Sequence, residues 1–393
     1  MLRFAYNGPR VRDQPLQFAR VCLFTGVGLL AISNEQALGQ STSRVSIARA
    51  SSNVTVSWTG RGTLQASSSL PVWQDVLEAT SPFTVSPTNT SQFYRSISRW
   101  STRSNLLEAN SEMSVAELNG NVYVMGGYPS TRVTVRTVQV YDSEQNRWSL
   151  TTPLPIPLNH AMPAVANGRL YIIGGQTNAS GDEAFVDTIF EYNPATTNWT
   201  ARAPMPTARS AGAAAVIGDL IYVAGGRPPQ GQDFAVYNVI SNQWTTLPNL
   251  PTGRNHLAAT AIDGCIYVAG GRLGGGFTSP MTPALEMYDP ATRGWTNRAP
   301  MLEPRGGVNG IAVDGCFFVF GGEGPNGIFN NNEMYVASMD RWFRLEPLPV
   351  AVHGVTGAAY LNGWIHLPGG GTQVGGSSGS TLHQVFWVGG ICP

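Results

Sequence analysis

A Gly-Gly pair returns six times along this chain, and a tryptophan precedes each pair at a nearly constant distance. The interval from the tryptophan to the first glycine of the next pair is 26 residues in five cases and 27 in the last. The tryptophans are Trp100, Trp148, Trp199, Trp244, Trp295 and Trp342, and the pairs are Gly126-Gly127, Gly174-Gly175, Gly225-Gly226, Gly270-Gly271, Gly321-Gly322 and Gly369-Gly370. Successive pairs lie 45 to 51 residues apart. A fixed period of this length indicates one supersecondary unit repeated within a single fold.

Each repeat predicts four short β-strands. The apolar run before a Gly-Gly pair, such as Leu170–Ile173, predicts a buried strand ended by glycine. A second strand with an aromatic residue follows, such as Ile189–Tyr192, and then a turn and the tryptophan strand. A proline-rich turn leads to a strand of small residues, such as Ala211–Ile217. The sequence therefore predicts an all-β fold.

The Gly-Gly pair, the spaced tyrosine, the spaced tryptophan and the period together resemble the Kelch repeat over residues 97 to 390. The resemblance implies a β-propeller of four-stranded blades around a central channel. The strand Leu382–Val388 has no tryptophan strand after it, whereas Trp100 stands in a strand, Ser96–Thr102, with no Gly-Gly pair before it. We expect the N-terminal strand to complete the last blade, so that six blades close without a free edge. The second glycine of each pair is expected to need positive φ or close backbone approach.

The start of the chain resembles a secretory leader. Four arginines between residues 3 and 20 precede the apolar stretch Val21–Ile32, and Ala37-Leu38-Gly39 forms a small-x-small cleavage site. We predict a signal peptide over residues 1–39 and export to the periplasm, the cell surface or the medium. The alternative is a buried strand or helix of the mature protein. No other stretch is long enough to span a bilayer.

Residues 40–96 predict a separate β-rich module and residues 97–393 the propeller. The module weakly resembles a short β-sandwich-like unit attached to secreted bacterial proteins, through Trp58, Trp73 and Phe93-Tyr94-Arg95. Cleavage of the leader would leave Cys265, Cys316 and Cys392, and three cysteines do not make a disulfide framework. We expect them to be buried thiols.

The net charge of zero and the 12% of charged residues exclude a nucleic-acid-binding surface and a polybasic membrane surface. All 24 basic residues are arginine. Arginine presents a planar fork that pairs with carboxylates.

The resemblance implies that two loops per blade line the mouth of the channel. The residue after each Gly-Gly pair lies in one of them; these residues are Tyr128, Gln176, Arg227, Arg272, Glu323 and Gly371. The other loop contributes a residue pair; these pairs are Ser111/Glu112, Asn159/His160, Ser210/Ala211, Asn255/His256, Gly306/Gly307 and Gly354/Val355. Arg209, Arg254 and Arg305, ten residues after a tryptophan, are expected to make structural hydrogen bonds.

The charged and polar side chains are unevenly distributed over these positions. Arg227, Arg272, Asn255 and His256 fall in two adjacent repeats. The repeat before them contributes Asn159, His160 and Gln176, and a later repeat contributes Glu323. Gly306, Gly307, Gly354 and Gly371 leave the opposite side bare. These residues predict a site for an acidic sugar or an acidic peptide, and the alternative is that they are ordinary solvated loop residues.

We expect a monomeric binding or scaffolding protein, and neither a cofactor nor a metal. The five histidines show no paired ligand spacing, and no nucleotide or hydrolase motif is present. One alternative is a sugar mutarotase or epimerase of the sialic-acid type, a six-bladed Kelch relative whose acid and base Glu112, Glu323, His160 and His256 could supply. Another is a structural cell-surface protein without a small ligand.

Overall fold

The computed structural model describes residues 21–25, 28–32, 45–50, 53–59, 62–69, 72–86, 92–129, 131–178, 184–228, 231–276 and 278–392. The chain divides into two compact units, Met1–Ser101 and Thr102–Pro393. None of the helices among these residues has the length and apolarity that crossing a bilayer requires.

The first unit contains two antiparallel sheets. One has the strand order β2-β1-β8-β5-β6 and the other β3-β4-β7. The strands are β1 (Val21–Thr25), β2 (Gly28–Ile32), β3 (Val45–Ala50), β4 (Asn53–Trp58), β5 (Thr63–Ser67), β6 (Gln74–Asp75), β7 (Phe83–Val85) and β8 (Gln92–Ile97). Buried residues from both sheets, among them Val56, Leu64 and Tyr94, form one apolar cluster. The module predicted over residues 40–96 therefore has a core of its own.

The predicted leader lies largely outside the described residues, and so does its cleavage site at Gly39. Two of its segments are described, and they form the hairpin β1–β2 beside β8. Export stays a prediction.

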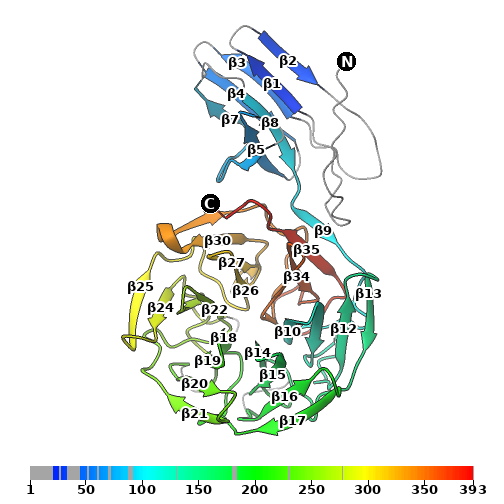
Figure 1. The fold of residues 1–393 in the computed structure, drawn as a ribbon, viewed down its shortest axis with the longest axis vertical. Helices are drawn as coiled ribbons and strands as arrows, with labels where there is room; N and C mark the ends of the chain where they lie inside the picture. The colour runs from blue at the N-terminus through cyan, green and yellow to red at the C-terminus, as the bar shows by residue number, and fades with distance from the viewer. Residues whose placement is uncertain are drawn as a thin grey trace. The chain divides into compact units, whose positions relative to one another are not determined.

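The second unit is a β-propeller, as the repeat predicts. Its sheets each contain four antiparallel strands and surround a common centre (Figure 1). The first three are β10 (Met113–Leu118), β11 (Asn121–Met125), β12 (Val138–Asp142) and β13 (Arg147–Leu150); β14 (Met162–Ala166), β15 (Arg169–Ile173), β16 (Ile189–Asn193) and β17 (Asn198–Arg202); β18 (Ala213–Ile217), β19 (Leu220–Ala224), β20 (Phe234–Asn238) and β21 (Gln243–Thr246).

Three further sheets follow along the described chain. They are β22 (Ala258–Ile262), β23 (Cys265–Ala269), β24 (Leu285–Asp289) and β25 (Gly294–Arg298); β26 (Asn309–Val313), β27 (Cys316–Phe320), β30 (Asn332–Val336) and β31 (Arg341–Arg344); β33 (Ala359–Leu361), β34 (Trp364–Pro368), β35 (His383–Trp387) and β9 (Trp100–Thr102). Short accessory elements are β28 (Glu323–Gly324), β29 (Gly327–Ile328), β32 (Val355–Thr356) and the 3-10 turn η1 (Ala337–Met339).

The last sheet combines the two ends of the repeat region. Its order is β33-β34-β35-β9, so the strand that contains Trp100 follows β35. Directly after β9, the Arg103 N–H donates to the His383 carbonyl at 2.9 Å. The short strand β32 pairs in parallel with β10 of the first sheet. The first and last sheets of the unit are therefore joined by backbone pairing.

The Gly-Gly pairs require glycine for two reasons. Both glycines of every pair have positive φ, for example 65° at Gly225 and 110° at Gly226. A Cβ on Gly226 would lie 2.7 Å from the Ser210 carbonyl oxygen. The expectation for the second glycine is met, and the first glycine shares the left-handed conformation.

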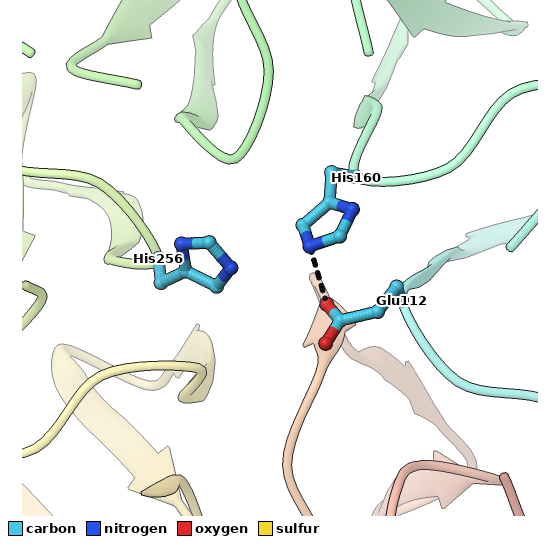
Figure 2. A group of neighbouring side chains, drawn as sticks. All are labelled: Glu112, His160 and His256. Atoms are coloured by element: carbon cyan, nitrogen blue, oxygen red, sulfur yellow. Dashed lines mark ion pairs between the residues drawn. The ribbon is translucent and has the colours of Figure 1, made fainter. Parts of the chain in front are cut away.

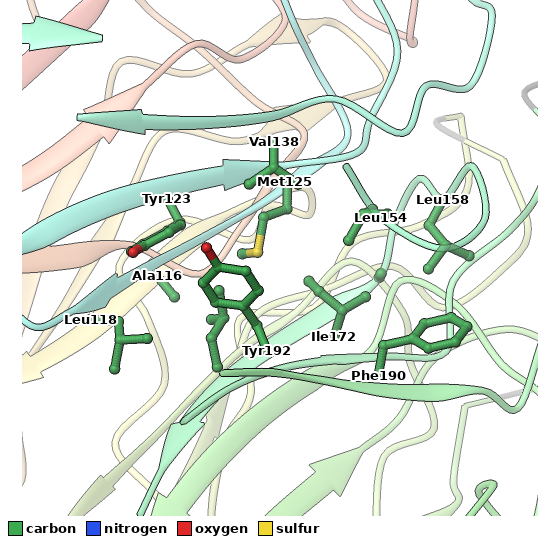
Figure 3. Close-up of a cluster of buried hydrophobic side chains, with 12 residues drawn as sticks. Ala116, Leu118, Tyr123, Met125, Val138, Leu154, Leu158, Ile172, Phe190 and Tyr192 are labelled. Atoms are coloured by element: carbon green, nitrogen blue, oxygen red, sulfur yellow. The ribbon is translucent and has the colours of Figure 1, made fainter. Parts of the chain in front are cut away.

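Neighbouring sheets bury their apolar faces against each other. Figure 3 shows Tyr123 and Met125 of the first sheet packed with Ile172, Phe190 and Tyr192 of the second. Five blade tryptophans, Trp148, Trp199, Trp244, Trp295 and Trp342, hydrogen-bond a carbonyl of a preceding loop through the indole N–H, as Trp199 does to Thr152 at 3.1 Å. This contact links each blade to the one before it.

Buried arginines hold the loops between strands. Arg254 pairs with Glu286 at 2.6 Å and Arg305 with Glu333 at 2.8 Å, and all four side chains are buried. Arg209 instead donates to the carbonyls of Gly225 and Asp233. The structure thus places these recurrent arginines in structural hydrogen bonds.

The expectation of three buried thiols is wrong, since two of the cysteines form a disulfide and the third, Cys265, is only half-buried. Cys316, at the start of β27, is disulfide-bonded to Cys392 near the chain end. Only Cys265 is free among the cysteines with described side chains. No pattern in the sequence indicated this pairing, because it joins positions 76 residues apart, one of them after the last strand.

Candidate functional site at the channel mouth

A closed ring of backbone hydrogen bonds surrounds the centre of the propeller. One residue from each blade takes part, and its N–H donates to the carbonyl of the corresponding residue of the preceding blade. The ring residues are Glu112, His160, Ala211, His256, Gly307 and Gly354, and the N···O distances run from 2.5 Å (Glu112 to Gly354) to 3.1 Å (Gly354 to Gly307). Because each residue gives and receives one bond, the ring fixes the backbone at six positions, four of which carry a side chain.

All six ring residues lie in the left-handed region. Their φ values run from 52° at Glu112 to 67° at Gly354. Glycine adopts this conformation freely at Gly307 and Gly354, whereas a residue with a Cβ is strained there. Four blades nevertheless carry a residue with a Cβ at this position. Backbone strain of this kind is concentrated at functional sites.

The residue before each ring residue pairs with the residue after a Gly-Gly pair. The bridges are Ser111 with Tyr128, Asn159 with Gln176, Ser210 with Arg227, Asn255 with Arg272, Gly306 with Glu323, and His353 with Gly371. The two sets of loops expected to meet do meet. The last pair is His353/Gly354, however, and the predicted pair Gly354/Val355 is wrong by one residue.

A cavity of about 150 Å³ opens at this mouth. Its polar lining residues include Arg227, Arg272, His160, His256, Gln176 and Glu323, all predicted from the sequence, and also Glu112, Tyr128 and Arg132. Asn159 and Asn255 do not line it. Their amide oxygens instead contact Nδ1 of the following histidine, at 2.5 Å for His160 and 2.6 Å for His256.

The two predicted arginines differ in their surroundings. Arg272 is buried and forms an ion pair with Glu323. Arg227 is half-buried and donates to the Gln176 side chain at 2.5 Å and to the Gly275 carbonyl at 3.2 Å. Glu323 also accepts the Gly375 N–H at 2.8 Å. The carboxylate of Glu323 therefore offsets much of the positive charge of Arg272, while Arg227 faces neutral acceptors in these contacts.

The side predicted to be bare carries polar groups. Its ring residues are glycines, but Glu323 and His353 reach the centre from the same blades. The Nδ1 atom of His353 lies 3.4 Å from Glu323 and 3.8 Å from Glu112, and its Nε2 contacts the Gln373 carbonyl at 2.6 Å. The glycines make room for neighbouring side chains and do not leave the side empty.

Glu112 and His160 form a carboxylate–imidazole pair at the mouth. Glu112 Oε2 lies 3.0 Å from His160 Nε2, and both side chains are buried (Figure 2). Despite the burial, which raises it, the pKa of Glu112 is lowered by His160, and by His353 and Arg272. Burial lowers the pKa of His160 although Glu112 opposes this. Burial also holds the pKa of His256 well below its ordinary value, and Arg272 adds to the effect.

The arrangement can do two kinds of chemistry. A carboxylate beside a neutral imidazole can exchange a proton with a bound ligand. Two groups can also hold a metal ion, since their ligand atoms lie within 4.8 Å of one another: Glu112, His160 and His256, and Glu112, Glu323 and His353. Figure 2 shows the first group facing a common space.

The sequence analysis missed His353, because it placed the loop pair of this blade at Gly354/Val355. Ring neighbours follow the blade tryptophan by 11 residues, as Trp244 and Asn255 do, and His353 follows Trp342 by the same 11. That count identifies it as a mouth residue. Arg132 left no such signal, because its loop differs from blade to blade.

Known proteins share this repeat. The model of the KLHDC2/KLHL20/DRC7 Kelch-repeats domain matches residues 159–370, and the Kelch motif matches residues 109–155. Kelch-like protein terF of Aspergillus terreus is 29% identical over 307 residues, which cover 70% of this chain and 65% of that protein. Beta-scruin of Limulus polyphemus is 25% identical over 66% of this chain, which spans only 24% of that protein. The solved structure of YjhT aligns with a TM-score of 0.60 and 17% identity over 72% of this chain and 97% of that one, and so supports the fold.

Proposed function

The chain belongs to the Kelch-repeat family, and we propose that its propeller binds an acidic group of a protein or carbohydrate at the channel mouth. Kelch-repeat propellers are typically protein-interaction scaffolds. The observation that carries the proposal is the cavity with Arg132, Arg227 and Arg272 in its wall. Arginine clusters in concave sites are the usual means of holding carboxylates.

The charge of the lining favours an anion. Three guanidinium groups and two carboxylates, Glu112 and Glu323, leave a formal excess of 3 − 2 = +1. The histidines add little positive charge, because burial lowers the pKa values of His160 and His256. Arg227 is half-buried in the cavity wall, where a ligand carboxylate can reach it, whereas Arg272 is buried and ion-paired with Glu323.

The size of the cavity limits what enters it. At about 150 Å³ it is smaller than the ~300–1,000 Å³ usual for drug-sized ligands. A single sugar ring or one acidic side chain fits this description better than a whole peptide. A larger partner would insert one group and rest on the surrounding loops.

Ligand-dependent thermal stabilisation tests the proposal. Glucuronate, glucose and an Asp/Glu-rich peptide would be added to the purified chain, and the unfolding temperature measured at low and high salt. A ligand at ~100 times its Kd should add about 2.7 kcal/mol of stability. We expect stabilisation by an acidic compound only, reduced by salt and lost in Arg227→Ala, whereas the control Arg293→Ala, on an exposed turn, should behave as wild type. Equal stabilisation of Arg227→Ala and wild type would contradict the site.

A second function is supported by the Glu112–His160 pair. A sugar mutarotase or epimerase needs one group to accept a proton and another to donate one, and these two side chains lie 3.0 Å apart at the cavity. Anomer exchange measured by NMR tests it. Catalysis that Glu112→Gln slows would favour this function, and exchange at the buffer rate would exclude it for the sugar tested.

We also propose that the protein is exported, on the basis of the N-terminal arginines and the apolar stretch Val21–Ile32. A monomeric state is proposed as well. N-terminal sequencing of the protein from each cell fraction tests export, with a start after Gly39 as the expected result. A protein that stabilises with no acidic compound and has no turnover would fit the remaining alternative, a structural surface protein.

A further inference from the structure

Both ring nitrogens of His160 face oxygen acceptors. The Nδ1 atom of His160 lies 2.5 Å from the side-chain oxygen of Asn159, and its Nε2 lies 3.0 Å from Glu112 Oε2. A neutral imidazole carries a single N–H, so it can donate to only one of them. The second acceptor is satisfied either by a second proton on the ring or by a metal ion bound to the other nitrogen.

The asparagine identifies which nitrogen carries the proton. The Asn159 side-chain nitrogen donates to Thr134 Oγ1 at 2.7 Å and to the Asn178 carbonyl at 2.9 Å, so its oxygen must face the imidazole. The N–H of His160 is then at Nδ1. The Nε2 position opposite the carboxylate then holds a positive charge, either a second proton or a metal ion that both groups bind.

His256, two blades further on, makes the same contact with the asparagine that precedes it. Its Nδ1 lies 2.6 Å from the side-chain oxygen of Asn255, whose nitrogen donates to the Gly274 carbonyl at 3.0 Å. His256 is 6% exposed. Among the residues that the structure describes, its Nε2 has no hydrogen-bond partner, and it faces the space in front of Glu112 and His160 (Figure 2).

We propose that Glu112, His160 and His256 bind a divalent transition-metal ion, zinc for preference, through Oε2 and the two Nε2 atoms. Two imidazoles and one carboxylate are a known three-ligand set for Zn²⁺ that leaves a fourth position open. Tetrahedral bonds of ~2.0 Å place neighbouring ligand atoms ~3.3 Å apart. The 3.0 Å pair is close to this value, and the limit of 4.8 Å for the group requires only small side-chain rotations.

The surroundings support the ligand set. A metal-bound histidine usually donates its other N–H to a fixed oxygen, which is the role that Asn159 and Asn255 fill. Arg272 would repel a cation, but Glu323 is bonded to it and offsets its charge. The proposal does not depend on the acidic ligand.

Cobalt titration of the full chain tests the site, because Co²⁺ replaces Zn²⁺ and has visible absorption bands. After treatment with EDTA, we expect bands that saturate at one Co²⁺ per chain and disappear when Zn²⁺ is added. His256→Ala should remove the saturable signal. Alanine occurs at the equivalent ring position as Ala211, with φ 53°, so the fold should tolerate the change.

The asparagines give a second variant with all three ligands intact. Asn255→Ser introduces the residue that stands at the equivalent position of another blade, Ser210. This variant should lower the affinity for the metal ion about 10- to 100-fold. Ala211→Gly is the control and should bind as wild type. The proposal is overturned if the folded wild-type chain gives no saturable signal, or if His256→Ala leaves it unchanged. A signal lost only in Glu323→Gln would move the ion to the other group and also overturn this assignment.

Discussion

The interior of the blades and the mouth of the channel are built on the same repeat, yet they treat side chains in opposite ways. In the interior the side chains recur: Tyr288 packs on Trp295 as Tyr335 packs on Trp342, with ring centroids 5.2 and 5.3 Å apart. At the mouth only the backbone recurs. The ring bonds repeat in every blade, whereas the side chains change from glutamate to histidine, alanine and glycine. Repetition marks what holds the fold, and departure from it marks the candidate site.

Breaking the interior should have the largest effect. Arg305 and Glu333 are fully buried, and Arg305 also donates to the Gly321 carbonyl at 2.7 Å. Arg305→Ala leaves a buried carboxylate without its partner, which we expect to cost about 3–5 kcal/mol of unfolding free energy. Urea unfolding monitored by tryptophan fluorescence measures it.

A paired replacement separates the charge from the packing. Arg305→Met with Glu333→Leu removes both charges and should recover much of the loss. If the single and the double variant are equally destabilised, the ion pair is not what Arg305 contributes.

Strain introduced into the backbone ring should have the next largest effect on stability. Ala211 holds φ 53°, a conformation that a β-branched residue adopts only under strain. We expect Ala211→Val to cost about 1–3 kcal/mol, and Ala211→Gly to be neutral or stabilising. The unfolding temperatures of the two variants, compared with wild type, decide the matter. Equal stability of the two would show that the ring does not impose this conformation.

The contribution of the mouth residue His256 to stability should depend on pH. The folded-state pKa of His256 lies well below its ordinary value, mainly because of burial. The unfolded chain then takes up a proton as pH falls below ~6.5 and the folded chain does not, so stability falls with pH. At about pH 5.5 this single histidine should cost on the order of 1 kcal/mol.

His256→Ala supplies the comparison for that measurement. Between about pH 7.5 and about pH 5.5 the variant should lose less stability than wild type, by on the order of 1 kcal/mol. Parallel pH profiles would mean that His256 is protonated as readily in the folded chain as in the unfolded one.

The fold was readable in the sequence because its signals are local and repeated. The Trp–Gly-Gly interval predicted each sheet, and the unaccompanied strand of Trp100 predicted where the last sheet finds its fourth strand. The last repeat has one extra residue, in the interval of 27. It falls after His353, where the first strand of that blade is split into β32 and β33. The sequence analysis placed the loop pair of this blade one residue too late, at Gly354/Val355, and therefore missed His353.

The site was readable only in part. Counting from the repeat found Arg227, Arg272, His160 and His256, because mouth positions follow from the period. The ion pair of Arg272 with Glu323 joins residues 51 positions apart in neighbouring blades. The approach of His160 to His256, with ring centroids 5.0 Å apart, crosses the blade of Ala211. Such contacts depend on side-chain direction at the centre of the ring, which no spacing in the sequence records.

One measurement tests directly whether the mouth side chains, and not the repeated scaffold, carry the binding function. Unfolding temperatures of wild type and Arg227→Ala would be recorded side by side, each without ligand and with glucuronate or the acidic peptide. The account predicts the same unfolding temperature for both proteins without ligand, and stabilisation by the acidic ligand in wild type alone. Stabilisation that persists in Arg227→Ala while the protein stays folded would contradict it.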